Sequence, residues 1–258
     1  MKTYNSIIIG SGLGGLTAGA LLALWGKKVL VLEQHYLAGG CATAFKRKDF
    51  LMEVGLHEID GLHEQDFKRP IMELLGLFNG VEFIKIPELY HIRKGGFSYV
   101  LPEGKQAKEQ LIRDFPNEGK SINDFFITIE KLYKEMHQMP RSKWFRRLIH
   151  PLMPLLYPTI ARTSRLTAGE WLDQHFKDKR LKTILTANMC YYTDDPFNLS
   201  LMYFLVAQGS YLNGGGHFVK GGSQALSSYL VHFIEQHGGQ VLTGKYAKEI
   251  LIENNRAV

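Results

Sequence analysis

Cysteine is scarce in this sequence. Cys41 and Cys190 are the only two among 258 residues, and they lie far apart. A disulfide-stapled domain and a zinc ribbon both require closely spaced cysteines, so we expect neither. The ten histidines show no H-E-x-x-H or similar spacing, and no metal site is predicted. The composition favours a reducing compartment, so we expect a cytoplasmic protein that is either free or peripherally bound to a membrane.

Long uninterrupted hydrophobic runs are also missing. Two windows without charge, residues 6–26 and 196–216, are long enough to span a bilayer. Six glycines divide the first window into strand, turn and helix, and the second ends in three glycines. We therefore predict neither a membrane-spanning helix nor a signal peptide, and we interpret the second window as a buried or ligand-facing helix.

Acidic residues are absent from residues 141–165. The net charge of the chain is +6, and this segment accounts for all of it. Its basic residues are Arg141, Lys143, Arg146, Arg147, Arg162 and Arg165. Because aromatic and aliphatic residues lie between them, contact with an anionic membrane surface is one interpretation. A solvated basic rim is the other. Nucleic-acid binding is not expected, since no binding motif accompanies the charge.

What is present indicates a folded α/β chain. Hydrophobic residues make up 45% of the sequence and charged residues 22%, which excludes disorder and suffices for one large or two modest domains. Residues 6–9 and 29–32 are short apolar runs typical of strands buried on both faces of a parallel sheet. Residues 13–25 are rich in leucine and alanine and end at Gly26, which predicts the connecting helix of a βαβ unit.

Later segments predict further elements in both halves of the chain. Strands are expected at residues 81–86, 90–92, 97–101, 240–243 and 250–253. Helices are expected at residues 122–136 with an entry near Ser121, at 171–185, and from an N-cap at Ser223 to Gly238. A last strand begins near Arg256, so the chain ends in a hairpin that has barely formed. We therefore expect the amino-terminal part of a longer protein.

The motif that carries chemistry follows the first strand. Residues 10–15, GSGLGG, fit G-x-G-x-x-G directly before a helix. Gly10 permits the tight turn, Gly12 lets the backbone approach a pyrophosphate, and Gly15 lets helix and strand pack closely. Glu33 ends the second strand, where a carboxylate accepts the ribose hydroxyls of adenosine and repels a 2′-phosphate. This context favours a dinucleotide site over an ordinary glycine-rich turn, with NAD or FAD as the ligand.

Two features favour FAD. Gly19 extends the glycine pattern, and Gly39-Gly40 follows Glu33 after five residues. This arrangement resembles the flavoprotein superfamily of amine oxidases, phytoene desaturases and Rab GDP-dissociation inhibitors. The resemblance implies that Gly39 and Gly40 lie against the diphosphate and ribityl chain of FAD.

The resemblance narrows to carotenoid desaturases and isomerases and retinol saturases. Residues 50–57 are similar to the strand that follows the double glycine in that family. Residues 217–223 and 238–241 are similar to the segment that returns to the FAD domain, and residues 191–204 are similar to part of the substrate domain. Val219 departs from a usual proline, and Ala247 from a usual valine that contacts adenine through its backbone. The family is also about twice as long as this chain.

This resemblance implies an α/β fold in which a Rossmann-like FAD-binding domain contains an inserted α+β substrate domain, apparently truncated. Residues 1–62 and 214–258 would form the FAD-binding domain and residues 63–213 the substrate domain, which would include the basic segment at residues 141–165. The implied cofactor-binding residues are Gly10, Ser11, Gly12, Leu13, Gly14, Gly15, Glu33, Gly39, Gly40 and Ala247.

The implied activity is that of an oxidoreductase acting on a carotenoid- or retinoid-like polyene, by hydride transfer with flavin N5. No catalytic residue is assigned. His57 is a weak candidate, and a structural histidine is the alternative. Two other functions stay open: an amine oxidase or porphyrinogen oxidase on the same scaffold, and a non-catalytic isoprenoid-binding protein.

Overall fold

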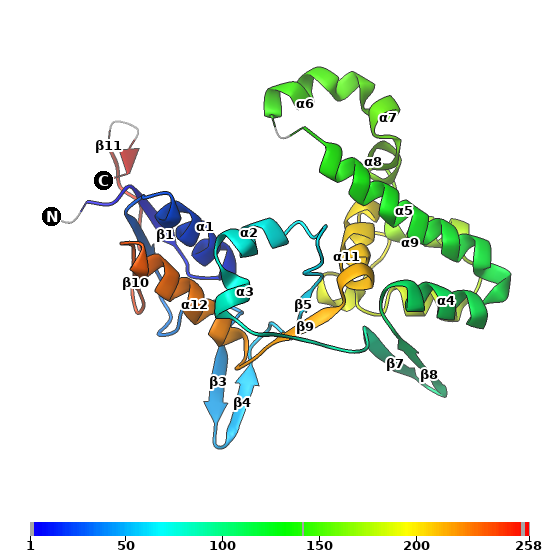
Figure 1. Ribbon diagram of the computed structural model, residues 1–258, viewed down its shortest axis with the longest axis horizontal. Coiled ribbons are helices and arrows are strands. Elements are labelled where there is room, and N and C mark those ends of the chain that lie inside the picture. Colours follow the sequence, from blue (N-terminus) through cyan, green and yellow to red (C-terminus); the bar gives the residue numbers. More distant parts are fainter. Residues whose placement is uncertain (1–2, 141, 254–255, 258) are drawn as a thin grey trace. The chain divides into compact units, whose positions relative to one another are not determined.

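The apolar runs near the amino terminus form a parallel sheet with a later strand. The computed structural model describes residues 3–140, 142–253 and 256–257 (Figure 1). In it, β1 (Ser6–Ile9) pairs with β2 (Val29–Leu32), which pairs with β10 (Gln240–Leu242), all in parallel. Helix α1 (Leu13–Leu24) connects β1 to β2, and α12 (Ser223–Gln236) packs against α1 and leads into β10. The predicted βαβ unit and the predicted return through helix and strand are confirmed.

Helices α1 and α12 pack against one face of the sheet. Ile8 points toward α1, where its side chain lies near Gly15 and Gly19. Ile7 and Ile9 point the opposite way, because successive side chains of a strand alternate between faces, and they are 56% and 55% exposed. The expectation that residues 6–9 are buried on both faces is therefore wrong for the described residues, in which β1 is also an edge strand.

The chain divides into two units by its internal contacts. Unit 1 contains Met1–Ile59, Glu64–Lys85 and His217–Val258, and unit 2 contains Asp60–His63 and Ile86–Gly216. Residues 64–85, which we expected in the inserted domain, pack with unit 1. Tyr229 of α12 makes this contact, because its hydroxyl donates to the Leu75 carbonyl at 2.8 Å.

The remaining elements of unit 1 are short. β3 and β4 form an antiparallel hairpin with Ala44 opposite Glu53, and β6 pairs antiparallel with β9. Only the first half of the predicted strand at residues 50–57 is regular. The elements are β3 (Ala44–Arg47), β4 (Phe50–Glu53), α2 (Arg69–Leu74), α3 (Leu77–Gly80), β6 (Phe83–Lys85), β11 (Ile252–Glu253) and β12 (Arg256–Ala257). The chain passes between the units in β5 (Ile59–Asp60), after His63, after β6 and in β9 (Gly216–Val219).

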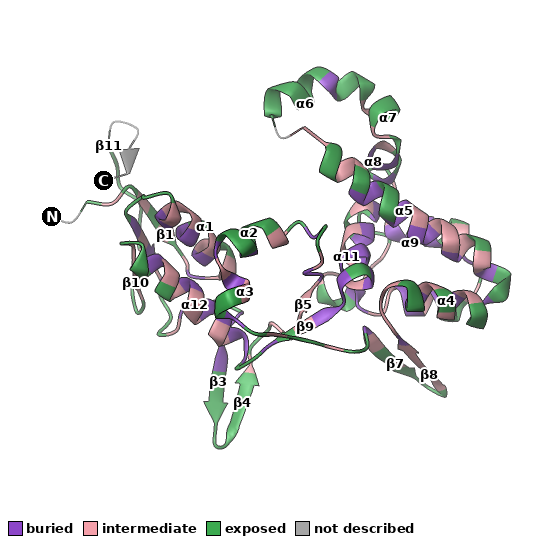
Figure 2. Ribbon diagram, in the orientation of Figure 1, coloured by how far each residue is buried: buried purple, intermediate pink, exposed green. Residues whose placement is uncertain are grey.

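Unit 2 is mainly helical and has its own hydrophobic core (Figure 2). At its centre Phe125 of α5 lies within 6.3 Å, ring to ring, of Trp171 and Phe204. Its elements are β7 (Tyr90–Lys94), β8 (Phe97–Leu101), α4 (Gly104–Asp114), η1 (Pro116–Glu118), α5 (Gly119–Gln138), α6 (Lys143–Ile149), η2 (His150–Leu152), α7 (Met153–Leu156), α8 (Pro158–Thr163), α9 (Ala168–His175), α10 (Lys179–Leu185), η3 (Met189–Tyr191) and α11 (Leu201–Gly214).

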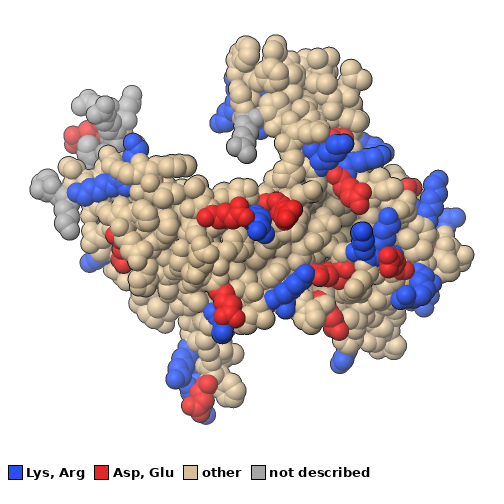
Figure 3. Space-filling model, in the orientation of Figure 1, with Lys and Arg blue, Asp and Glu red and all other residues tan. Residues whose placement is uncertain are grey.

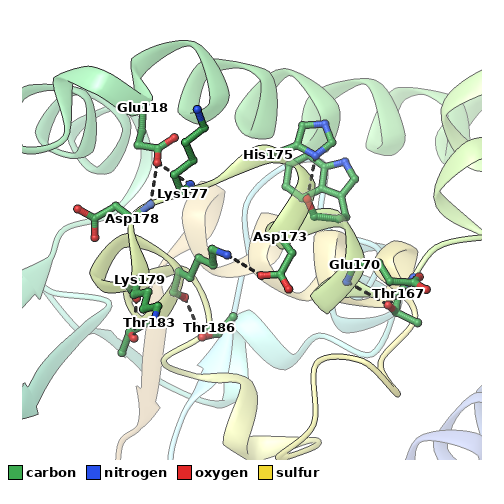
Figure 4. A network of polar contacts seen from close by, with 12 residues as sticks. Glu118, Thr167, Glu170, Asp173, His175, Lys177, Asp178, Lys179, Thr183 and Thr186 are labelled. Carbon is green, nitrogen blue, oxygen red and sulfur yellow. Dashed lines mark hydrogen bonds and ion pairs between the residues drawn. The ribbon is translucent and has the colours of Figure 1, made fainter.

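Two helix predictions in unit 2 need correction. Helix α5 begins at Gly119, before the expected entry at Ser121, because η1 leads directly into it. The single helix expected at residues 171–185 is two helices, α9 and α10. Between them the Glu118 carboxylate accepts from the backbone N–H groups of Lys177 and Asp178 at 2.7 and 2.8 Å (Figure 4). This distant acceptor takes backbone donors that a continuous helix would use itself.

Candidate dinucleotide-binding site

The glycine-rich turn places open space at the start of α1. Gly10 has a φ of +96°, and Gly12 is the N-cap residue of the helix. A Cβ at Gly15 would lie 2.2 Å from the Gly10 carbonyl oxygen, so the helix packs directly over the turn. At Gly12 and Gly14 a Cβ would meet nothing within 4 Å. The turn is therefore closed on the side of Gly15 and open at Gly12 and Gly14, where the first N–H groups of α1 attract an anion.

The Glu33 carboxylate is tied to this turn. Its Oε2 accepts from the Ser11 N–H at 2.8 Å and from the Ser11 hydroxyl at 2.7 Å. Its Oε1 accepts from the His35 N–H at 2.8 Å. Ser11 is fully buried and Glu33 is 8% exposed. The end of β2 and the turn after β1 are thus joined by side chains as well as by the sheet.

These hydrogen bonds keep Glu33 ionised. Burial by itself raises the pKa of this carboxyl. Hydrogen bonds from His35, Ser11 and Gln34 outweigh burial, so the pKa of Glu33 lies below its ordinary value of 4.5. The site therefore carries a buried anion, which suits neutral hydroxyl donors and repels a phosphate.

The double glycine lies beside the glycine-rich turn. Gly39 forms a parallel bridge with Gly12, and a Cβ at Gly40 would lie 3.1 Å from the Gly12 Cα. The Gly39 N–H donates to the Ser11 hydroxyl oxygen at 3.3 Å. A Cβ at Gly39 would lie 2.4 Å from the Ala42 carbonyl oxygen, and its φ of +132° also favours glycine. Ser11 therefore joins the turn, the acid and the double glycine.

Helix α12 holds the double-glycine loop from the other side. The Ser227 hydroxyl donates to the Ala42 carbonyl at 2.7 Å, and the Gln224 amide donates to the Ala38 carbonyl at 3.0 Å. The sequence did not reveal these contacts, because their partners lie about 185 residues apart in the chain. The local sequence showed only the helical spacing of the apolar residues of α12, which does not identify the partners of its polar side chains.

The start of α12 differs from the prediction. Its N-cap residue is Gly222, and Ser223 is its first helical residue. The Glu53 carboxylate on β4 accepts from the Ser223 N–H at 2.9 Å and also from the Ser223 hydroxyl. An acid from another strand thus performs the capping that we expected from Ser223, and a negative charge at a helix N-terminus is favourable.

Two predicted site residues lie farther along the chain. Ala247 is half-buried and follows Lys245, whose N–H donates to the Glu33 carbonyl at 2.7 Å. The segment after β10 therefore passes along the backbone at Glu33 before it reaches Ala247. His57 lies between β4 and β5 with an exposed side chain.

The described residues contain no group of three or more histidine, cysteine, aspartate or glutamate side chains arranged to hold a metal ion. Within the same residues, no helix has the length and apolar character needed to cross a membrane.

The sequence of the chain is similar to a domain family and to several known proteins. The NAD(P)-binding Rossmann-like domain family matches residues 8–74. The chain is 30% identical to inactive all-trans-retinol 13,14-reductase of Danio rerio, over 97% of this chain and 42% of that protein. It is 29% identical to all-trans-retinol 13,14-reductase of Danio rerio, over 98% of this chain and 43% of that protein. Phytoene desaturase (neurosporene-forming) of Cereibacter sphaeroides is 26% identical, over 98% of this chain and 49% of that protein.

The chain spans less than half the length of these relatives. Solved structures agree on the fold. Cyclohexylamine oxidase from Brevibacterium oxydans has a TM-score of 0.59 at 19% identity, over 93% of this chain and 51% of that one. Rab GDI from Plasmodium falciparum has a TM-score of 0.59 at 13% identity, over 98% and 61%. The predicted α/β fold and the predicted resemblance to retinol saturases and carotenoid desaturases are confirmed.

Proposed function

From its relatedness to retinol 13,14-reductases and a phytoene desaturase, we propose that this chain is the FAD-binding portion of an oxidoreductase acting on a retinoid- or carotenoid-like polyene. The observation that carries the proposal is the pair of hydrogen bonds at the Ser11 hydroxyl, one to Glu33 and one from Gly39. These bonds bring together the three sequence features of an FAD site. The enzyme class comes from the relatives, and the site supports the cofactor.

The residues present fit a dinucleotide. Gly12 and Gly14 leave room at the helix N-terminus, where Gly10 to Gly15 would bind the diphosphate. Glu33 would accept the ribose hydroxyls, Gly39 and Gly40 would lie along the ribityl chain, and Ala247 would contact adenine through its backbone. FAD, when bound, supplies hydride exchange at N5. The chain's own part is to orient the cofactor and keep the Glu33 anion away from water.

FAD is proposed over a nicotinamide nucleotide because the double glycine lies directly against the glycine-rich turn. The test is to remove any bound nucleotide from the purified chain and to titrate it with FAD, NAD and NADP, with calorimetry as the readout. We expect FAD to bind most tightly and NADP to bind least, because the Glu33 anion opposes a 2′-phosphate. Tightest binding by NAD, or no binding of any of the three, would overturn the cofactor proposal.

The substrate class needs a separate measurement. The complete gene product, purified with flavin, is incubated with all-trans-retinol, with a carotene and with a primary amine. We propose turnover of a polyene and none of the amine. Turnover of the amine alone would favour the amine oxidase alternative, and prenyl binding by a flavin-free protein would favour a non-catalytic role. The similarity to a reductase whose name includes "inactive" makes the turnover assay necessary even where flavin is bound.

A peripheral membrane location is part of the same proposal. Long polyenes are apolar and partition into bilayers, so an enzyme that acts on them gains access to its substrate at a membrane surface.

A further inference from the structure

Unit 2 presents a projecting apolar face on α6, η2 and α7. Six large apolar side chains of this segment are exposed, and we call them the α6–α7 face: Trp144, Phe145, Leu148, Leu152, Leu155 and Leu156. Trp144 and Leu148 lie four residues apart on α6, which places them on one side of that helix, and the spacing of three and four residues continues through η2 and α7. Trp144 is 71% exposed and Leu155 is 79% exposed. Figure 2 shows α6 and α7 mostly in the colour of exposed residues.

The segment is anchored to unit 2 by polar contacts of the residues that directly follow it and by a buried residue on its other side. The Glu135 carboxylate of α5 accepts from the backbone N–H groups of Thr159 and Ile160 at 3.0 and 2.9 Å. The Tyr157 hydroxyl donates to the Gln138 carbonyl at 3.3 Å, and Ile149 is buried. The fold therefore directs one side of the segment inward and leaves the α6–α7 face outside.

Basic side chains border this face. Lys143, Arg146, Arg147 and His150, with Pro151, line a concavity of about 540 Å³. The sequence contains no aspartate or glutamate between residues 141 and 165. In Figure 3 the projection at α6 and α7 is largely uncharged, with cations at its border. An apolar face beside a cationic concavity matches the acyl region and the anionic headgroups of a bilayer.

We propose that the α6–α7 face docks unit 2 on an anionic phospholipid bilayer, with its apolar side chains at the acyl boundary and its cations on the headgroups. The basic residues favour an anionic bilayer over an uncharged protein groove as the binding partner. Such a groove would contact the apolar side chains but would offer the arginines no opposite charge. Helices of seven and four residues lie on the surface and do not cross it. The inference deepens the proposed function by supplying the route of a lipid-soluble substrate, but its test requires neither flavin nor turnover.

Two of the chain's three tryptophans are exposed, Trp144 and Trp25, and Trp171 is buried. In the Trp25→Phe variant, Trp144 is therefore the exposed fluorophore. The full chain carrying this change is mixed with vesicles of phosphatidylcholine and about one third phosphatidylserine, with and without brominated acyl chains. We expect a blue shift of the emission, quenching by the brominated lipid, and much weaker binding to phosphatidylcholine alone or at high salt.

Two sets of variants separate the apolar from the charged part. Leu148→Ser with Leu152→Ser and Leu155→Ser leaves Trp144 in place as the reporter and should weaken vesicle binding by roughly tenfold or more for each side chain withdrawn from lipid. Arg146→Gln with Arg147→Gln should weaken it by roughly 30-fold, given about fivefold for each cation near an anionic surface. All five side chains lie at the surface, so folding is retained. The matched controls are Trp25→Ser, and Lys245→Gln with Lys248→Gln, which alter exposed residues of unit 1 and should bind as the parent does.

Three results would overturn the proposal: no vesicle binding, equal loss in the controls, or Trp144 emission that brominated lipid does not quench. Light scattering of the same variants completes the test. If the parent forms a dimer, does not bind vesicles, and becomes monomeric with the three serine substitutions, a second copy of the chain covers this face. Flavin binding measured on these samples reports on the proposed function separately.

Discussion

The Ser11 hydroxyl donates to Glu33 Oε2 at 2.7 Å and accepts from the Gly39 N–H at 3.3 Å. One buried hydroxyl thus joins the glycine-rich turn, the acid at the end of β2 and the double glycine. The fold itself therefore holds these three features together, which lowers the ordering cost of binding a nucleotide.

Ser11→Ala tests this junction. The Ser11 N–H still donates to Glu33, but the Gly39 N–H loses its acceptor and Glu33 loses one donor. We expect a decrease of roughly 1–3 kcal/mol in the free energy of unfolding, measured in urea, and weaker FAD binding. Ser164→Ala is the control, because that hydroxyl is exposed and bonds only locally. An equal effect of the two changes would contradict a joining role for Ser11.

Gly15→Ala and Gly14→Ala should differ in stability. At Gly15 the new Cβ would lie 2.2 Å from the Gly10 carbonyl oxygen, and backbone cannot rotate away as a side chain can. We expect a loss of roughly 1–3 kcal/mol or failure to fold. At Gly14 the Cβ meets open space, so alanine should leave stability unchanged or raise it by up to about 1 kcal/mol. Thermal unfolding of the pair measures the difference, and similar melting temperatures would refute the close packing.

Gly12→Val separates folding from cofactor binding. A Cβ at Gly12 has no protein atom within 4 Å, so the variant should fold as the parent does. The branched side chain would occupy the space proposed for the diphosphate, and FAD binding should fall by at least roughly a hundredfold. Circular dichroism and FAD titration on one sample give both readouts. Retained affinity would show that the diphosphate lies elsewhere.

The pH dependence of stability should contain a contribution from Glu33. Its pKa is lower in the folded chain than in the unfolded chain, so the unfolded chain binds this proton more tightly. The stabilisation is complete above about pH 4.5 and is lost as the pH falls through the folded-state pKa. Unfolding in urea across this range compares the parent with Glu33→Gln. The difference between them should shrink toward acid pH, and a constant difference would contradict the shift.

Glu53→Ala tests the cap that joins β4 to α12. The change removes the acceptor of both the Ser223 N–H and the Ser223 hydroxyl. We expect a loss of roughly 0.5–2 kcal/mol in stability, the usual effect of removing a helix cap. Glu249→Ala, an exposed acid of the same unit, is the control. Hydrogen exchange of the α12 amides locates the effect, and uniform exchange in both variants would exclude a capping role.

The sequence alone was sufficient to predict the strand–turn–helix unit that carries the proposed dinucleotide site. The G-x-G-x-x-G pattern, the acid at Glu33 and the apolar runs around them are local signals, because each residue acts within one strand–turn–helix unit. The same locality explains why the amphipathic helix α5 was predicted almost to its ends.

The tertiary structure decided what depends on residues far apart in the chain. Glu118 divides α9 from α10, Glu53 caps α12, and Ser11 receives the Gly39 N–H, each through a partner that the local pattern does not name. Neighbouring positions of β1 also differ in burial, since α1 and α12 pack against the face of the sheet to which Ile8 points and Ile7 and Ile9 point the other way. Backbone donors need hydrogen-bond partners and apolar faces need to be buried. In this chain the residues that fulfil both needs lie far away in the sequence, so only the folded structure identifies them.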